Sequence, residues 1–252
     1  MAIVNNPGFA ARTAYYLKKI QGLHPYWKIN YKIKCKSTEK ELSNWLKLKD
    51  IKRNRPVVII AKEQFSGFGQ NSKKWISPKG GIWLSAAYPI FSKNFSCQIF
   101  SLSLAISLCQ MLKEENVKVN LKWPNDILYD SKKLIGLLPR VITRGKETIY
   151  VRIGIGMNFL NKPPIEGISL AELLNTKYIN EYYWTAKILK AFNDAIILNE
   201  RKEYIIETAN KLLAKTNLPK GYSPNNWTIR GLDKNGNLRI FNCKEEKILK
   251  RF

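Results

Sequence analysis

The chain has 252 residues, of which 45% are hydrophobic and 25% are charged. These proportions are typical of a globular protein with a packed core, and they exclude a chain that is disordered throughout. Lysine and arginine number 43 against 19 aspartate and glutamate residues, so the formal net charge is +24. Such a charge attracts anions, including nucleic acids. Because the lysines are dispersed, we interpret the charge as compositional bias, with weak attraction of anionic partners as a by-product.

The cysteines Cys35, Cys97, Cys109 and Cys243 include no Cys-x-x-Cys pair, and His24 is the only histidine. A zinc site is therefore not expected, and the cysteines should be reduced thiols. The N-terminus lacks a basic segment followed by an apolar run, and no apolar stretch reaches the roughly 18 residues that span a membrane. We therefore expect no signal peptide, no membrane partner and a cytoplasmic location.

The first half of the chain predicts strands interleaved with helices. The expected elements are helix 12–20, strand 31–35, helix 39–48, strand 56–61, strand 81–88 and helix 101–115. Thr38 and Glu41 have the Thr-x-x-Glu spacing of a capping box at the start of a helix. The continuous apolar run at 56–61 is typical of a buried strand, and a glycine-rich loop follows it.

The second half adds strands 117–121, 134–142 and 148–155 and helices 184–199 and 202–215. The turn at 130–133 leaves no room for a crossover helix, so it predicts a hairpin. The fold class is therefore α+β with a mixed sheet and helices packed on it. Short strands around Asn235-Gly236 predict a small β module, which divides the chain into domains 1–219 and 220–252.

Two loops carry residues suited to chemistry. In the loop 64–75, Gly67 and Gly69 let the backbone approach a ligand and let its N–H groups bind an anion, although ordinary turns share this pattern. In the segment 122–126, which reads Lys-Trp-Pro-Asn-Asp, the Asp126 carboxylate is suited to Mg²⁺. Asn-Asp is equally an ordinary turn former, so neither segment decides the function alone.

Two strand segments add further candidates. Lys133 enters an apolar strand that contains Gly136, so its ammonium is suited to a carboxylate or phosphate beside a residue that leaves room for a ligand. A solvated hairpin lysine is the alternative interpretation. The segment 154–158 ends a strand with two glycines and the amide of Asn158.

In their order and spacing, these segments resemble the motifs of biotin–protein ligases. That family has a Gly-Arg-Gly-Arg-x-Gly-Arg-x-Trp loop, then Ser-Pro, Gly-Gly, Lys-Trp-Pro-Asn-Asp, Lys-Leu/Ile-x-Gly-Ile-Leu and Gly-x-Gly-x-Asn. The matching segments here are 67–75, 77–78, 80–81, 122–126, 133–138 and 154–158. The resemblance covers about residues 30–215, and Ser37-Thr38 matches the start of the family's Ser-Thr-Asn. It implies a class II synthetase-like catalytic domain with a small C-terminal SH3-like module.

The resemblance also implies site residues. Those implied to bind biotin are Ser37, Thr38, Gln64, Gly67, Phe68, Gly69, Gln70, Lys133 and Gly136. Those implied to bind ATP are Lys73, Trp75, Asn125, Asp126 and Asn158. Lys133 is the implied catalytic residue, which holds the biotin carboxylate and the α-phosphate, and Asp126 is the implied Mg²⁺ ligand.

The implied activity has two steps, formation of biotinyl-5'-AMP from biotin and ATP and transfer of biotin to a lysine of a biotin carboxyl carrier protein. The implied cofactors are ATP and Mg²⁺, and no specific nucleic acid is expected. The segment before Ser37 is too short for a winged-helix DNA-binding domain, so we expect the form that lacks one. The oligomeric state, including a homodimer, stays open.

Several positions depart from the family pattern. Phe68 and Gln70 replace the first two loop arginines, Lys73 replaces the third, and Ser72 replaces a glycine. Elsewhere, Glu39 replaces the asparagine of Ser-Thr-Asn, and Arg140 stands where the family often has an acidic residue. Two alternatives follow, which are lipoate or octanoyl transfer within the same superfamily and a catalytically weakened homologue that acts as a basic binding protein.

Overall fold

The computed structural model describes residues 7–21, 27–47, 55–70, 73–91, 95–144 and 147–250, so His24 and Ser72 lie outside the described residues. The helices are α1 (Pro7–Gln21), α2 (Thr38–Lys47), α3 (Cys97–Glu114), α4 (Leu170–Leu173), α5 (Glu181–Leu198) and α6 (Lys202–Leu212). The strands are β1 (Lys28–Lys32), β2 (Val57–Ala61), β3 (Ile82–Pro89), β4 (Asn120–Lys122), β5 (Asp126–Tyr129), β6 (Lys132–Arg144), β7 (Glu147–Met157), β8 (Thr228–Leu232), β9 (Leu238–Phe241) and β10 (Glu246–Leu249).

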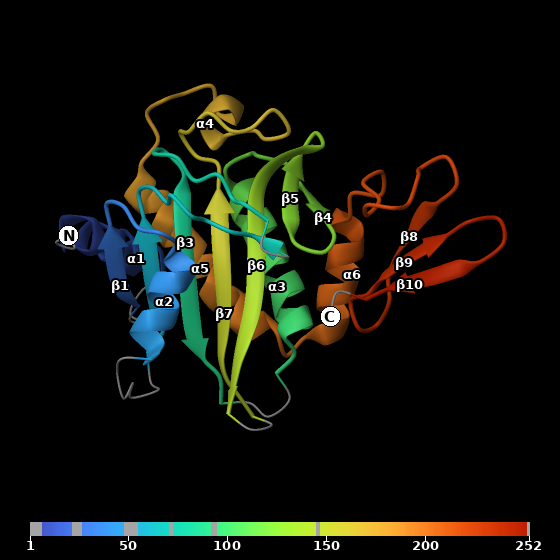
Figure 1. Cartoon of the computed structure of the whole chain (residues 1–252), viewed down its shortest axis with the longest axis horizontal. Coiled ribbons are helices and arrows are strands. Elements are labelled where there is room, and N and C mark those ends of the chain that lie inside the picture. Colours follow the sequence, from blue (N-terminus) through green and yellow to red (C-terminus); the bar gives the residue numbers. More distant parts are fainter. Residues whose placement is uncertain are drawn as a thin grey trace. The chain divides into compact units, whose positions relative to one another are not determined.

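The strands form a mixed seven-stranded sheet and a small antiparallel sheet (Figure 1). The order in the large sheet is β1-β2-β3-β7-β6-β5-β4. β1 and β2 are parallel, whereas β2 with β3, β3 with β7, β7 with β6 and β4 with β5 are antiparallel. The small sheet has the order β10-β9-β8. Both sheets confirm the predicted α+β class and the C-terminal β module.

The chain divides into two compact units, residues 1–95 with 135–190 and residues 96–134 with 191–252. Strand β6 contributes its first residues to the second unit and the remainder to the first. The independent folding of residues 220–252 as a domain stays a prediction.

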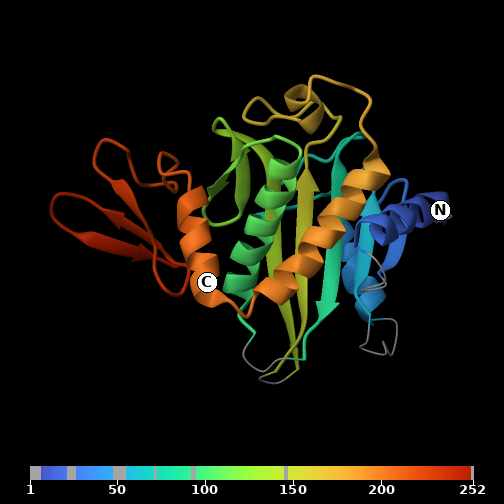
Figure 2. The same cartoon turned by 180° about the vertical axis from the view of Figure 1, so that it is seen from behind.

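In the first unit, one hydrophobic cluster fixes helix α2 on the sheet. Leu42 of α2 is buried against Val57 and Ile59 of β2, Ala87 of β3 and Tyr150 of β7. The first part of α5 covers the opposite face (Figure 2). The cluster contains only apolar groups and one tyrosine, so hydrophobic burial stabilises it. It places the N-terminal end of α2 over the strands that carry the glycines of segment 154–158.

In the second unit, α3 packs on α6 and on strands β4 and β5. The turn between β8 and β9 is tied to α3 and to the Lys-Trp-Pro-Asn-Asp segment. Gln98 Nε2 donates to Asn237 Oδ1 at 3.0 Å, and Trp123 Nε1 donates to the Gly236 carbonyl at 3.0 Å. The C-terminal module therefore contacts a segment that the sequence analysis linked to chemistry.

Some predicted boundaries were wrong. The first strand spans 28–32 rather than 31–35, because Cys35 forms only an isolated bridge with Gln64. The capping box at Thr38 was also wrong, since the Thr38 hydroxyl bonds to other elements and Glu41 pairs with Lys32. Helix α1 begins at residue 7, and strand β10 was not predicted. Among the helices described, none has the length and hydropathy of a membrane span.

Candidate functional site

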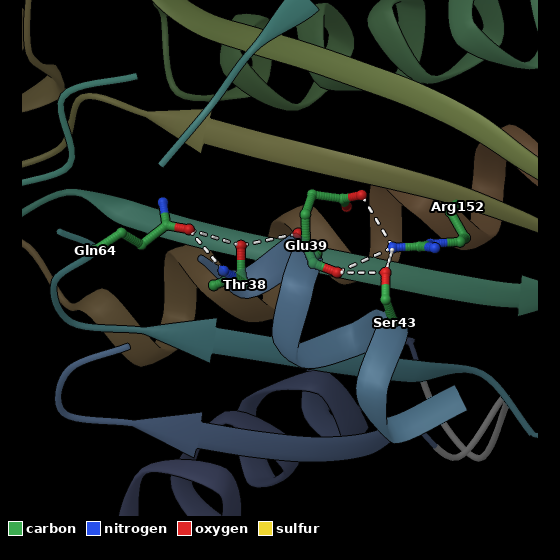
Figure 3. A network of polar contacts seen from close by, with 6 residues as sticks. Thr38, Glu39, Ser43, Gln64 and Arg152 are labelled. Carbon is green, nitrogen blue, oxygen red and sulfur yellow. Dashed lines mark hydrogen bonds and ion pairs between the residues drawn. The ribbon is translucent and has the colours of Figure 1, made fainter. Parts of the chain in front are cut away.

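A chain of polar side chains in the first unit joins the start of α2 to the loop after β2 (Figure 3). The Gln64 amide oxygen accepts from the Thr38 backbone N–H at 2.7 Å and from the Thr38 hydroxyl at 3.1 Å. The Thr38 hydroxyl also lies 2.8 Å from the Ser85 hydroxyl, and Gln64 Nε2 donates to Ser77 Oγ at 2.9 Å. Thr38 and Gln64, predicted from separate segments, are therefore brought together, and Ser37 immediately precedes Thr38.

Beside this chain lies an ion pair that the sequence analysis did not predict. Arg152 Nη2 donates to Glu39 Oε2 at 3.0 Å, to the Glu39 carbonyl at 3.1 Å and to Ser43 Oγ at 2.9 Å (Figure 3). The side chains of Glu39 and Arg152 are only 5% and 12% exposed. Burial lowers the pKa of Arg152, and the charge of Glu39 opposes that shift. An arginine in the otherwise apolar strand 150–155 was the available sequence signal.

Within the loop 64–75, the described residues on either side of the turn pair in antiparallel fashion, with a bridge between Phe68 and Lys74. Trp75 N–H donates to the Gly67 carbonyl at 2.9 Å, and Gly69 N–H donates to the Lys73 carbonyl at 2.8 Å. A side chain at Gly67 would lie 2.7 Å from the Trp75 carbonyl oxygen, so the turn itself requires this glycine. The Gly69 N–H is already used within the loop, contrary to the expectation that it would face an anion. Gln70 and Lys73 bond to each other through backbone groups, Lys73 N–H to Gln70 carbonyl at 3.1 Å.

Two glycines of β7, Gly154 and Gly156, form a strip without side chains, here called the glycine strip. The Trp75 indole lies over Gly156, where a side chain would approach it to 2.6 Å. Glu39 lies beside Gly154, where a side chain would stand 3.6 Å from Glu39 Oε1. Gly136 of β6 pairs with Gly156. The loop, helix α2 and strand β6 therefore meet along this strip.

Phe68 of the loop contacts Arg140 of β6. The guanidinium carbon of Arg140 lies 5.5 Å from the centre of the Phe68 ring, within the range of a cation–π interaction. Arg140 is cross-strand to Arg152, so two guanidinium groups stand on adjacent strands. The exposed Arg140 places a positive charge next to a loop that has lost two arginines.

In the second unit, Lys133 and Asp126 form a close ion pair. Lys133 Nζ lies 2.7 Å from Asp126 Oδ1, with side-chain exposures of 30% and 18%. Asp126 begins β5 and Lys133 is the second residue of β6, which follows a two-residue turn at Asp130 and Ser131. Both turn residues have positive φ, 42° and 66°, as a tight hairpin of this kind requires. Half-buried and paired, the two groups are held in place yet accessible.

The remaining predicted residues lie in turns. Asn125 N–H donates to the Lys122 carbonyl at 3.1 Å, next to a cis Trp123–Pro124 bond. Asn158 accepts from Asn161 Nδ2 at 3.1 Å within its own loop. Over the part of the chain that the structure describes, no three His, Cys, Asp or Glu residues form a group suited to a metal ion. A metal at Asp126 would therefore depend on other ligands.

The family model described as the Biotin/lipoate A/B protein ligase family matches residues 32–158, half of the chain. The Bifunctional ligase/repressor BirA of Bacillus subtilis (strain 168) is 32% identical over 109 residues, which cover 42% of this chain and 33% of that protein. The Biotin--[acetyl-CoA-carboxylase] ligase of Paracoccus denitrificans is 27% identical over 108 residues, 42% of this chain and 45% of that protein. The chain thus spans less than half the length of these curated relatives.

A solved structure has the same fold. The biotin protein ligase from Aquifex aeolicus in complex with biotin and ATP aligns with a TM-score of 0.69 and 21% identity. The alignment covers 88% of this chain and 95% of that chain. At 21% identity the alignment shows a shared fold only. An activity has to be argued from the motifs of this chain.

Proposed function

Because the chain belongs to the biotin/lipoate A/B protein ligase family, we propose that it is a biotin–protein ligase. It would form biotinyl-5'-AMP from biotin and ATP and transfer the biotin to a lysine of a biotin carboxyl carrier protein. The observation that carries this proposal is the polar chain of Thr38, Gln64 and Ser77 at the end of the glycine strip. The need for ATP and a carboxylase carrier fits a cytoplasmic enzyme.

The polar chain favours a ring with hydrogen-bonding groups over an apolar one. When an apolar ligand covers hydroxyl and amide groups, these groups lose hydrogen bonds that the ligand cannot replace. The ureido ring of biotin can replace those bonds, whereas the dithiolane of lipoate or an octanoyl chain cannot. Thr38 and Gln64 therefore support biotin over the lipoate alternative.

Lys133 is proposed to bring the two anionic reactants together. In the first step the biotin carboxylate oxygen attacks the α-phosphorus of ATP, the bond to the bridging oxygen breaks, and pyrophosphate leaves. A lysine ammonium neutralises charge on both groups, and such positioning and charge stabilisation supply most of the acceleration in phosphoryl chemistry. The contact with Asp126 holds the Lys133 ammonium in place before the reactants bind.

We propose that Mg²⁺ binds here only together with ATP, because the phosphates would supply most of its ligands. Asp126 supplies one carboxylate and lies against an ammonium group, and Mg²⁺ commonly uses one or two carboxylates together with phosphate oxygens. Asp126 and Asn125 would face the phosphates, and the ion would supply charge neutralisation there. Trp75, Lys73 and Asn158 are proposed to support the nucleotide.

In the second step the carrier lysine, as a neutral amine, attacks the acyl carbon of the adenylate, and AMP leaves. The glycine loop that contains Gly67 and Gly69 is proposed to cover the adenylate during this interval, which excludes the water that would hydrolyse it. Its Trp75 indole already lies on Gly156. Neither step needs an enzyme-linked intermediate or a nucleic-acid partner, and sedimentation of the full chain measures whether it forms a homodimer.

The direct test incubates the protein with biotin, ATP, Mg²⁺ and a biotin carboxyl carrier domain. Mass spectrometry should show one biotin on the carrier lysine, and pyrophosphate should appear only when biotin is present. Parallel reactions with lipoic and octanoic acid test the superfamily alternative. Calorimetric titration that detects no biotin binding, with or without ATP, would contradict the proposal.

A further inference from the structure

A pocket of about 520 Å³ lies in the first unit, between helix α1 and the start of helix α5. This volume is within the range of binding pockets in proteins, roughly 300–1,000 Å³. None of the residues assigned to biotin or ATP lines it, so the pocket is a second candidate binding site. Its lining residues are Ala11, Arg12, Tyr15, Tyr16, Asn180 and Tyr182.

Helix α1 packs beside β1, the edge strand of the large sheet (Figure 1). Phe9, Thr13 and Leu17 of α1 recur every four residues and are buried, so they form the inner face of the helix. The Phe9 ring stacks on Tyr31 of β1, with the ring centres 4.0 Å apart. Arg12 is exposed. Replacing Arg12 should therefore leave the packing of α1 intact.

The side chains of the pocket offer donors to a ligand. Tyr16 Oη accepts a hydrogen bond from Asn180 Nδ2 at 2.9 Å. Tyr182 Oη accepts one from Arg12 Nη1 at 3.2 Å. Asn180 Oδ1 accepts from the Tyr183 N–H at 3.1 Å, which orients the amide. The two phenolic hydrogens and the other N–H groups of Arg12 are donors that these bonds do not use. A carboxylate suits them, because it accepts only and carries the opposite charge.

The electrostatic surroundings of the pocket also favour an anion. Helix α1 carries Arg12, Lys18 and Lys19 and no acidic residue. Asn180 immediately precedes α5, and the N-terminal end of a helix of that length bears a partial positive charge. Glu181, the acidic residue of that helix start, does not line the pocket. A carboxylate in the pocket would therefore meet positive potential from both helices.

The exposed residues at the pocket are those of a protein-binding surface. Tyr15 is 57% exposed, and Tyr178, two residues before Asn180, is 99% exposed. The Arg12 guanidinium lies 5.2 Å from the centre of the Tyr182 ring. Tyrosine and arginine are enriched where proteins bind other proteins. A small metabolite would leave the exposed rings uncovered, so the pattern favours an acidic side chain of a protein partner.

The pocket lies near the loop that the proposed function uses. Tyr31, on which α1 packs, pairs with Ile60 of β2, and Gln64 follows that strand. The charge of Lys62, two residues before Gln64, also acts on Glu181 at the start of α5. We therefore propose that the pocket docks the carrier protein by binding one of its acidic side chains. This inference rests on the proposed ligase function, which makes the carrier a substrate.

Arg12→Ala tests the inference in the full chain. The KM for a biotin carboxyl carrier domain should rise by about 10-fold, because the pocket loses its charged donor. Pyrophosphate release from biotin and ATP without carrier should not change, and neither should thermal unfolding, since Arg12 is exposed. Lys18→Ala is the matched control. It removes one charge from the same helix outside the pocket and should leave the KM within about twofold.

Tyr182→Phe removes one phenolic donor but keeps the ring that contacts Phe9, so the KM should rise by a smaller factor. Alanine replacement of each exposed acidic residue of the carrier domain should identify one that raises the KM of the unchanged enzyme but not that of Arg12→Ala. Equal KM values for Arg12→Ala and Lys18→Ala, or the lack of such a coupled carboxylate, would overturn the docking role. Absence of adenylate formation by the unchanged protein would instead remove the proposed function, and this inference with it.

Discussion

The guanidinium carbon of Arg140 lies 5.5 Å from the centre of the Phe68 ring. Phe68 occupies a loop position where the resembling family has an arginine, and Arg140 projects from β6 at a position often acidic in that family. The contact therefore places a guanidinium on the strand next to the loop. Its cross-strand neighbour Arg152 contributes a second positive charge, and the charge of Arg140 helps burial to lower the pKa of Arg152.

Arg140→Ala is expected to weaken retention of the adenylate by about 10-fold, because a charged hydrogen-bond donor near the loop is lost. Release of radiolabelled biotinyl-AMP from the full chain measures this effect. Arg140→Lys keeps the charge but not the planar donor group, so its release rate should lie between those of the unchanged protein and Arg140→Ala. Equal release rates in all three proteins would mean that Arg140 only packs on Phe68.

Lys133→Ala should reduce adenylate formation by at least about 100-fold, since the group proposed to neutralise both reactants is removed. Initial rates of pyrophosphate release measure this step. Lys132→Ala is the matched control, because Lys132 is the preceding residue of the same strand and is exposed. Comparable losses in both variants would show that general positive charge, and not the position of Lys133, supports the reaction.

The order of motifs predicted that Thr38 and Gln64, from separate segments, belong to one site, and the structure places them in contact. Short motifs predict local backbone well because turns and strand ends depend on neighbouring residues. Thr38 and Gln64 were assigned from two such motifs, and the structure joins them through hydrogen bonds. The pair of Glu39 and Arg152 could not be predicted, because the two residues are 113 positions apart and the register of β7 decides which side chain faces α2.

The fold class was also predictable from the alternation of strands and helices and from the hairpin at 130–133. Boundaries were less predictable where tertiary contacts decide them. Thr38 has the spacing of a helix cap, yet its hydroxyl bonds to Gln64 and Ser85 from other elements. The tie between Trp123 and Gly236 likewise joins segments 113 positions apart.

Trp123→Phe tests that tie. The variant removes the indole N–H that donates to the Gly236 carbonyl and leaves the rest of the aromatic packing largely intact. The free energy of unfolding should fall by about 1–3 kcal/mol, because a buried carbonyl loses its donor. Urea denaturation measures the change. Trp227→Phe, in the C-terminal module, serves as control and should cost less; an equal cost would show that the hydrogen bond contributes nothing specific.

Burial of two cysteine thiols is expected to protect them from chemical modification. Burial raises the pKa of Cys35 to about 12, with a further contribution from Glu41, and burial alone raises the pKa of Cys109 to about 12. Both side chains are buried, whereas Cys243 is exposed. Because the thiolate is the reactive form, iodoacetamide at about pH 8 should modify Cys243 and leave the two buried thiols intact until the protein unfolds.

The sign of the pH effect follows from the same shift. In the unfolded chain these thiols ionise near their ordinary pKa of 9.0, whereas the fold holds them neutral to about 12. Their contribution to stability is therefore complete below about pH 9 and is lost as the pH rises toward 12. Urea denaturation across this range should show a falling free energy of unfolding. Cys109→Ala should lose less stability over the range than the unchanged protein, whereas Cys243→Ala should lose as much; identical slopes for Cys109→Ala and the unchanged protein would contradict the assignment.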